Sequence, residues 1–142
     1  MSKKRIYLSG PMDGVTPEWA TEWRKQVAKE LPKCDTFDPC AGKDLYAYDV
    51  HDNAFTPEQI VEADCQEIAD SDIVLVDWRR VPGFDKPLRV GTIMEMVYGK
   101  QASKLIVTFG TLRRGYWLRY HADYHFDQLS DAIEFLREWS RV

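Results

Sequence analysis

Short apolar runs alternate along the chain with longer segments in which apolar residues recur at helical spacing. The run Arg5 to Ser9 stops at Gly10-Pro11, as a buried strand that ends in a turn does. The branched apolar run Asp72 to Asp77 is the clearest strand, because a parallel strand that is covered on both faces is apolar throughout. Weaker strands are predicted at 35–39 and 104–109, and helices at about 17–31, 57–68, 91–102 and 128–139.

Two of these helices carry clear start signals. Thr16-Pro17-Glu18 combines an N-cap residue, a proline at the first helical position and an early acidic residue. Thr56-Pro57-Glu58-Gln59 repeats this signal and adds a glutamine at the last position of a capping box. Both helices are therefore expected to begin at the proline.

Strands that alternate with helices at this spacing predict an α/β fold, because neighbouring parallel strands need crossover connections. We expect one three-layer domain over residues 1–142, with a parallel sheet of four or five strands and a flavodoxin-like or Rossmann-like topology. The stretches 40–55 and 79–89 and the aromatic stretch 116–126 show no sustained period and are interpreted as irregular.

Ligands of such sheets bind at the carboxyl ends of the strands, so functional residues are expected directly after the strands or at the helix starts that face them. By this rule the candidates for substrate binding are Ser9, Gly10, Asp77, Arg89 and Gly91.

The segment Gly10-Pro11-Met12-Asp13-Gly14 lies where a dinucleotide-binding fold carries G-x-G-x-x-G. Pro11 and the missing third glycine break that fingerprint, which excludes a nicotinamide cofactor. Two interpretations of Gly10 stay open: a tight turn that needs glycine, or a loop whose backbone amides approach a ligand. The histidines and cysteines show no spacing typical of a zinc site, so neither a metal nor a cofactor is expected.

Composition narrows the class of partner. Hydrophobic residues at 44% and charged residues at 30% of 142 residues are typical of a globular chain, and no apolar run approaches the ~20 residues that span a membrane. The net charge of -4 disfavours nucleic acid, so small molecules are the expected partners. Three cysteines without a pairing pattern are interpreted as free thiols of a cytoplasmic protein.

The stretch Arg89 to Gly99 opens a helix beside the expected ligand edge, and Glu95 has two interpretations there. Thr92-x-x-Glu95 is a good capping box, in which Glu95 only bonds the backbone of Thr92. Alternatively, the carboxylate faces a pocket and acts as a nucleophile or base. Further carboxylates are Asp64, on the preceding helix, and Asp77, at the end of a strand.

Three segments together resemble the nucleoside 2-deoxyribosyltransferases and the related nucleotide N-glycoside hydrolases. They are Ile6-Tyr7-Leu8-Ser9-Gly10-Pro11, Asp64 followed by the run from Asp72, and Gly91-x-x-Met94-Glu95-x-x-Tyr98. The resemblance spans most of the first 100 residues in the right order, and it places Gly91 and Met94 beside the substrate.

The resemblance implies a role for each of three residues. Glu95 attacks the anomeric carbon of a 2-deoxyribosyl group, expels the base and leaves a covalent sugar ester, which a second base or water resolves. Tyr7 holds the carboxylate of Glu95, and Asp64 contacts the base and protonates the leaving nitrogen. From the residues alone, the favoured interpretation of Tyr7 is a core aromatic, and that of Asp64 is a residue on a solvated helix face.

Arg89 departs from the family pattern. Transferases of the family carry an aspartate six residues before the nucleophile, whereas the hydrolases of 5'-monophosphates carry a phosphate-binding residue there. Arg89 suits a phosphate because its guanidinium is a planar fork of donors. The same loop carries Arg79, Arg80 and Lys86, and a solvated charge run is the commoner explanation of such a cluster.

The resulting hypothesis is an enzyme that cleaves the N-glycosidic bond of 2'-deoxynucleosides and transfers the sugar to another base. The alternatives are hydrolysis of 2'-deoxynucleoside 5'-monophosphates and a non-catalytic nucleotide-binding module. The expected partners are a nucleoside or nucleotide, a free base, and further copies of the chain in a homodimer or larger homo-oligomer. The resemblance implies a site that a neighbouring subunit completes, and the aromatic stretch Tyr116 to Phe126 is the candidate for that contribution.

Overall fold

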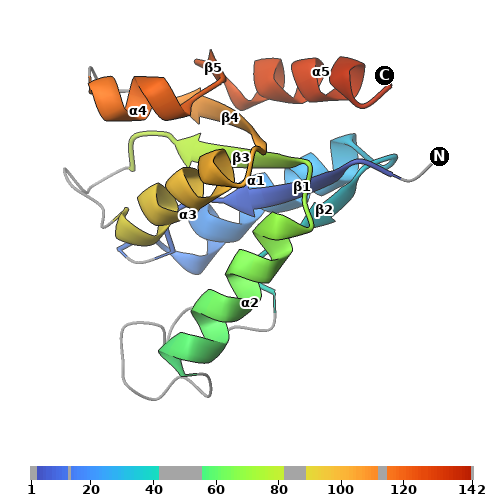
Figure 1. The fold of residues 1–142 in the computed structure, drawn as a ribbon. Helices are drawn as coiled ribbons and strands as arrows, with labels where there is room; N and C mark the ends of the chain where they lie inside the picture. The colour runs from blue at the N-terminus through green and yellow to red at the C-terminus, as the bar shows by residue number, and fades with distance from the viewer. Residues whose placement is uncertain (1–2, 13, 42–55, 82–88, 112–114, 142) are drawn as a thin grey trace.

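A computed structural model of the chain describes residues 3–12, 14–41, 56–81, 89–111 and 115–141. Strands and helices alternate along these residues (Figure 1). In chain order they are β1 (Arg5–Ser9), α1 (Pro17–Glu30), β2 (Asp35–Phe37), α2 (Pro57–Ala69), β3 (Ile73–Trp78), α3 (Val90–Gln101), β4 (Leu105–Gly110), α4 (Tyr116–His121), β5 (Tyr124–Phe126) and α5 (Leu129–Trp139).

The strands form one five-stranded sheet in the order β2-β1-β3-β4-β5, and every pair is parallel. This is the flavodoxin-like arrangement, so the expected α/β fold is confirmed. In the register, Tyr7 pairs with Val74 and Ser9 with Val76. Side chains of paired residues lie on the same face of a sheet, and this register therefore decides which residues share a face with Tyr7 and Ser9.

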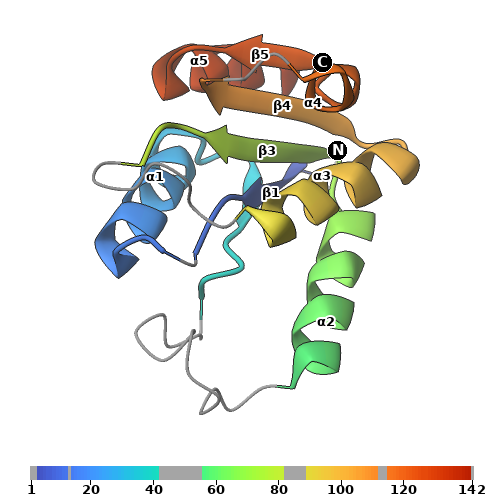
Figure 2. The same ribbon diagram turned by 90° about the vertical axis from the view of Figure 1, so that its left-hand side faces the viewer.

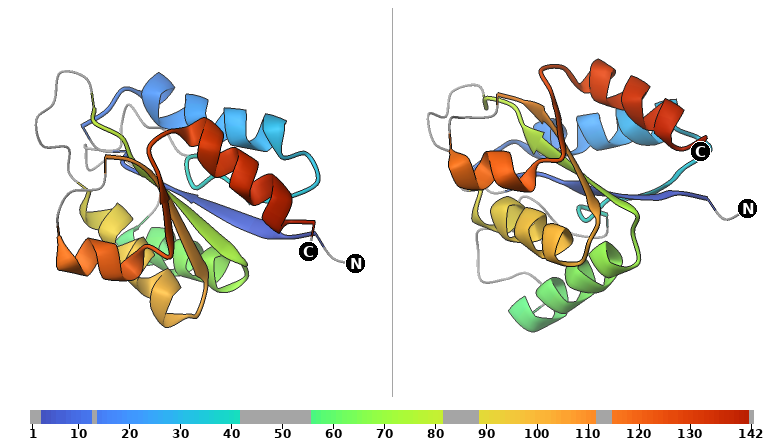
Figure 3. Two further views of the ribbon diagram at one scale, coloured as in Figure 1. Left: turned by 90° about the horizontal axis from the view of Figure 1, so that it is seen from above. Right: turned by 45° about the horizontal axis from the view of Figure 1, so that its top comes forward.

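Helices cover both faces of the sheet. Helices α1 and α5 pack on one face, where Trp23, Val27 and Ile133 meet the odd-numbered apolar residues of β3. Helices α2, α3 and α4 cover the other face, where Ile68 and Met96 meet the even-numbered ones. Figure 2 shows α1 and α3 on opposite sides of the sheet, and Figure 3 shows the pair α1 and α5 apart from the other three helices. The face under α2 and α3 is called the α3 face below, and the opposite one the α1 face.

The start signals of α1 and α2 are confirmed. The hydroxyl of Thr16 accepts a bond from the Trp19 amide at 3.1 Å, and Pro17 begins the helix. Thr56 and Gln59 form both bonds of a capping box, at 3.2 and 2.9 Å.

The aromatic stretch 116–126 is more regular than the sequence pattern predicts, because it contains α4 and β5. Strand β5 joins the sheet edge beside β4. Of the two other stretches interpreted as irregular, residues 42–55 and 82–88 lie outside the described part of the chain. Within the described ranges, no helix has the length and apolar character that crossing a membrane requires.

Candidate functional site

Glu95 of α3 is held by two hydroxyl groups of β1. The Tyr7 hydroxyl donates a short hydrogen bond to Oε2, and the Ser9 hydroxyl donates one of 2.9 Å to Oε1. Tyr7 and Ser9 are two residues apart on a strand, so both side chains point to the α3 face. Both are fully buried. Each oxygen of the carboxylate thus has a neutral donor, and α3 is docked onto the carboxyl end of β1.

The capping-box interpretation of Glu95 is wrong. Helix α3 begins at Val90 with Arg89 as its N-cap, and no side chain bonds the cap. Thr92 is therefore already the third helical residue rather than the N-cap. A residue three positions further along lies in the second turn, where its side chain meets β1 and not the start of the helix.

A cavity of about 410 Å³ opens in front of this carboxylate. Its walls come from the loop after β1, from α2 and from the first half of α3, and most of the wall is apolar. The lining residues are Gly10, Pro11, Met12, Ile60, Val61, Asp64, Cys65, Ile68, Val90, Gly91, Thr92, Met94, Glu95 and Tyr98. Two carboxylates, one on α2 and one on α3, are the acidic groups among them.

Burial raises the pKa of Glu95 to about 7. The hydrogen bonds from Tyr7 and Ser9 lower this pKa, the charge of Asp64 raises it, and that of Arg24 lowers it. Burial and the charge of Glu95 raise the pKa of Tyr7 far above its ordinary value, so Tyr7 remains a hydrogen-bond donor to the carboxylate. Near neutral pH, Glu95 is therefore divided between a protonated form and an ionised form that can attack or accept a proton.

The structure brings together most of the candidates from the sequence. Asp64 lines the cavity from α2 and is close enough to Glu95 to raise its pKa. Gly10, Gly91 and Met94 line the cavity as well, and Ser9 holds the carboxylate from below. What these residues do with a ligand stays a prediction.

Asp77 is not part of this group, and its expected place in the cavity is corrected. It follows Val76 on β3, whose partner Ser9 points to the α3 face, so the side chain of Asp77 points to the α1 face. There its two oxygens accept bonds of 3.0 Å each from Nε and Nη2 of Arg79. The side chain of Asp77 is fully buried in this ion pair.

Arg89 lies beside the cavity without lining it. Its guanidinium donates to the backbone carbonyls of Asp77 and Arg79 and lies 5.0 Å from the ring centre of Trp78. Arg79 is bound to Asp77, so two of the four basic residues singled out in this loop have partners inside the protein. Lys86 lies outside the described residues.

Cys65 is a cavity residue that the sequence analysis treated only as a structural thiol. It lines the wall next to Asp64, and burial together with the charges of Asp64 and Glu95 raises its pKa, which keeps the thiol protonated. Helical spacing was the available signal, because Val61, Cys65 and Ile68 follow one another at intervals of four and three residues.

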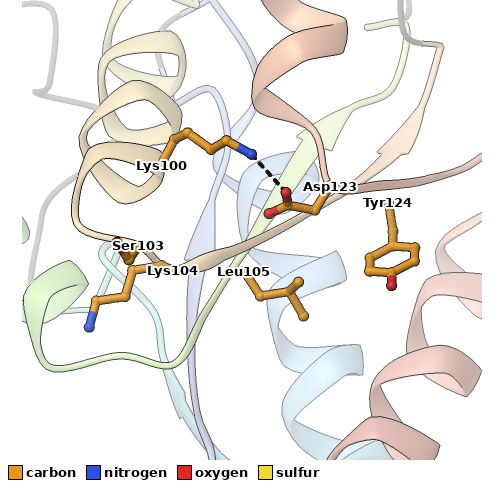
Figure 4. Close-up of a pocket in the computed structure, with 6 residues that line it drawn as sticks. All are labelled: Lys100, Ser103, Lys104, Leu105, Asp123 and Tyr124. Carbon is orange, nitrogen blue, oxygen red and sulfur yellow. Dashed lines mark hydrogen bonds and ion pairs between the residues drawn. The ribbon is translucent and has the colours of Figure 1, made fainter.

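A second, open hollow of about 610 Å³ lies at the amino end of β4, away from the carboxyl ends of the strands (Figure 4). It is lined by Lys100, Ser103, Lys104, Leu105, Asp123 and Tyr124. Lys100 and Asp123 form an ion pair at 2.7 Å, so these two charged groups of the hollow already bind each other. Across the described part of the chain, no three His, Cys, Asp or Glu side chains gather as a metal site.

Comparisons with known proteins identify the fold. The 2-desoxiribosyltransferase from Leishmania mexicana matches with a TM-score of 0.66 and 18% identity, over 95% of this chain and 97% of that chain. The 2-deoxyribosyltransferase from Bacillus psychrosaccharolyticus matches with 0.65 and 18%, over 91% and 90%. CMP N-glycosidase BcmB from Clostridium botulinum matches with 0.60 and 15%, over 96% and 99%. No protein-family model and no curated protein matches the chain by sequence. The chain therefore shares its fold with 2-deoxyribosyltransferases and with a nucleotide N-glycosidase.

Proposed function

We propose that the protein cleaves the N-glycosidic bond of 2'-deoxynucleosides and transfers the deoxyribosyl group to another base. One observation carries this proposal: the carboxylate of Glu95 faces a cavity while Tyr7 and Ser9 hold both of its oxygens. The shared fold supports the same reaction class, because the similar structures include two 2-deoxyribosyltransferases and a CMP N-glycosidase.

The reaction consists of two displacements at the anomeric carbon. An oxygen of ionised Glu95 attacks this carbon, and the electrons of the C–N bond move to the base, whose nitrogen takes a proton from Asp64. A nitrogen of the second base then attacks the same carbon, the ester bond breaks, and the proton lost by that nitrogen returns to Asp64. The two carboxyl groups must therefore hold different protonation states at the start of the reaction.

The cavity wall suits the base. Apolar side chains such as Ile60, Val61 and Met94 present a surface on which a flat ring loses little by leaving water. A site that binds one base mainly through apolar contact also accepts another in its place. Exchange of bases across the sugar ester is consistent with such a wall.

A second candidate is hydrolysis of 2'-deoxynucleoside 5'-monophosphates, and the start of α3 favours it. Val90, Gly91 and Thr92 line the cavity, and within the described part of the chain no side chain caps the helix, so backbone N–H groups of the first turn can face an anion. Arg89 stands at the N-cap.

Separation of products distinguishes the candidates. The protein is incubated with each of the four deoxynucleosides and deoxynucleoside 5'-monophosphates, with and without a different free base, and the products are separated by chromatography. We expect a new nucleoside only when the second base is present. Release of free base from monophosphates alone would establish the hydrolase instead. If no substrate is cleaved, the protein is a non-catalytic nucleotide-binding module.

The assembly is expected to be at least a dimer. Tyr116, Trp117 and Tyr120 of α4 are 91%, 81% and 71% exposed, and exposed aromatic groups of this kind are enriched in interfaces. Light scattering at micromolar concentration measures the mass directly. A fully active protein with the mass of one 16.6 kDa chain contradicts this expectation.

A further inference from the structure

Arg24 of α1 is buried at the carboxyl end of β1, with 1% of the residue exposed. Its Nε donates to the carbonyl of Leu8 at 3.2 Å and its Nη2 to the carbonyl of Gly10 at 3.1 Å. Nη1 donates to the carbonyl of Ala20 in the same helix. Among the described residues, the carboxylate nearest to the guanidinium is that of Asp38, 3.6 Å from Nε. Its bonds thus go mainly to backbone carbonyls rather than to a carboxylate.

Leu8 and Gly10, whose carbonyls Arg24 bonds, are the residues on either side of Ser9. Arg24 holds them from the α1 face, while the side chain of Ser9 points the other way and bonds Glu95 at 2.9 Å. Gly10 also begins the loop that forms one wall of the cavity. The guanidinium and the carboxylate of Glu95 therefore act on the same three residues from opposite faces of the sheet.

The guanidinium of Arg24 and the two carbonyls that it bonds are closely packed, and we call this arrangement the clamp. A Cβ atom at Gly10 would lie 3.3 Å from Nη2 of Arg24 and 3.0 Å from the Cβ of Asp77. Isolating a charge from water costs free energy that a neutral side chain of similar size does not. A guanidinium at this place therefore indicates a task that an apolar side chain does not perform.

We propose that Arg24 is a positioning residue for Glu95. It acts by clamping the carboxyl end of β1, where Ser9 bonds Glu95 and Gly10 begins the cavity wall. This proposal rests on the proposed function only in so far as ionised Glu95 is the reacting group. The buried charge has a second effect, because a cation on the far side of the strand favours the ionised carboxylate.

The groups around Glu95 show why that charge matters. Burial and Asp64 both raise the pKa of Glu95, while Tyr7 and Ser9 lower it through hydrogen bonds from β1. Cys65 of α2 and Tyr98 of α3 line the same cavity. Among the causes that act on Glu95, the charge of Arg24 is the cationic one, and it opposes that of Asp64.

The test measures the pKa of Glu95 without any substrate. Protein labelled with ¹³C at the glutamate side-chain carboxyl is titrated by NMR, and the Glu95 signal is assigned by its loss in Glu95→Gln. We expect a midpoint of about 7 in the wild type and a shift to higher pH in Arg24→Gln, which removes the charge and keeps an amide donor. Arg137→Gln, a change of the same type on the surface of α5, should leave the midpoint in place.

Arg24→Lys separates the clamp from the charge, since lysine keeps the charge and loses the fork of donors. We expect its Glu95 midpoint to stay near that of the wild type, while kcat falls about tenfold and KM changes little. Circular dichroism establishes that each variant is folded; if Arg24→Gln does not fold, Arg24→Lys still decides whether the clamp acts on Glu95.

An unchanged or lowered midpoint in folded Arg24→Gln overturns the electrostatic part of the proposal, and wild-type kcat in Arg24→Lys overturns the clamp. A wild type that cleaves no nucleoside or nucleotide refutes the proposed function instead, and the titration still shows whether Arg24 acts on Glu95.

Discussion

Glu95 and Asp77 are two carboxylates at the same end of the sheet, and their surroundings differ in kind. Asp77, on the α1 face, is completely buried and accepts three hydrogen bonds from Arg79: two from the guanidinium and one of 2.9 Å from the backbone amide of Arg79. The guanidinium of Arg79 lies 4.1 Å from the ring centre of Trp19. Glu95, on the α3 face, accepts hydrogen bonds from the hydroxyls of Tyr7 and Ser9 and faces a cavity.

We interpret the difference as that between a structural carboxylate, Asp77, and the proposed nucleophile, Glu95. A guanidinium that bonds both oxygens of a carboxylate neutralises its charge and occupies the lone pairs that a substrate needs. Hydroxyl donors orient a carboxylate but leave its charge uncompensated, and burial then raises the pKa of Glu95 to about 7. The contrast predicts that changes at Glu95 affect chemistry and changes at Asp77 affect stability.

The largest expected effect is on turnover. Glu95→Gln should reduce kcat at least about a thousandfold while substrate still binds, because the substitution removes the proposed nucleophile and keeps the shape of the site. Asp77→Asn, the matched change on the other face, should keep kcat within a few-fold of the wild type. Steady-state kinetics and binding of substrate to Glu95→Gln measure both. A comparable loss in a folded Asp77→Asn returns Asp77 to the substrate-binding role predicted from the sequence.

Stability should show the opposite order. Asp77→Asn should lower the free energy of unfolding by about 2 kcal/mol. The asparagine amide has one acceptor oxygen, whereas Nε and Nη2 of Arg79 donate to both oxygens of Asp77. Glu95→Gln should change it by less than about 1 kcal/mol, because glutamine can still bond Tyr7 and Ser9. Urea denaturation followed by circular dichroism compares the two variants. Equal losses would mean that the two carboxylates serve the fold alike.

Removing a hydroxyl should move the pH profile of the reaction. In the proposed reaction the ionised form of Glu95 attacks, so on the acidic side kcat/KM should rise with pH with a midpoint of about 7. The hydrogen bond from Tyr7 lowers the pKa of Glu95, so Tyr7→Phe should move this midpoint to higher pH and reduce kcat/KM at pH 6.5 about tenfold. Ser9→Ala should act in the same direction. A midpoint that moves to lower pH in either variant contradicts this account of the site.

The sequence predicted the fold well where a local signal decides it. Strand β1 has the bounds expected from its apolar run, and Thr16 and Thr56 cap the helices that their prolines begin. The short elements α4 and β5 were missed, because six and three residues are too few for a period to emerge.

The candidate site depended on facts that spacing alone does not contain. Asp77 was placed in the cavity because it ends a strand, but only the pairing of Ser9 with Val76 shows that residue 77 faces away. Glu95 had two interpretations until the helix start at Val90 excluded the capping box. Arg24 gave no signal, because a lone arginine in an amphipathic helix is normally solvated and its buried partners are backbone carbonyls.

The smallest expected effect compares two glycines of the cavity wall. A Cβ at Gly10 meets Asp77 and Trp23 at 3.0 and 3.1 Å, whereas one at Gly91 meets nothing within 4 Å. Gly10→Ala should therefore destabilise the protein by about 1 kcal/mol through overpacking, and Gly91→Ala should stabilise α3 by about 0.5 kcal/mol through helix propensity. Thermal denaturation ranks the pair. A Gly10→Ala variant as stable as Gly91→Ala would show that the end of β1 is not closely packed.

Mass spectrometry of the quenched reaction tests the central claim, the attack of Glu95 on the sugar, most directly. The protein is denatured in acid during turnover of a deoxynucleoside without an acceptor base, digested, and searched for added mass. We expect one deoxyribosyl group on the peptide that contains Met94-Glu95-Met96, and none in Glu95→Gln. Cleavage that proceeds with wild-type turnover in Glu95→Gln, or a sugar adduct on a different residue, would contradict the assignment of Glu95 as the nucleophile.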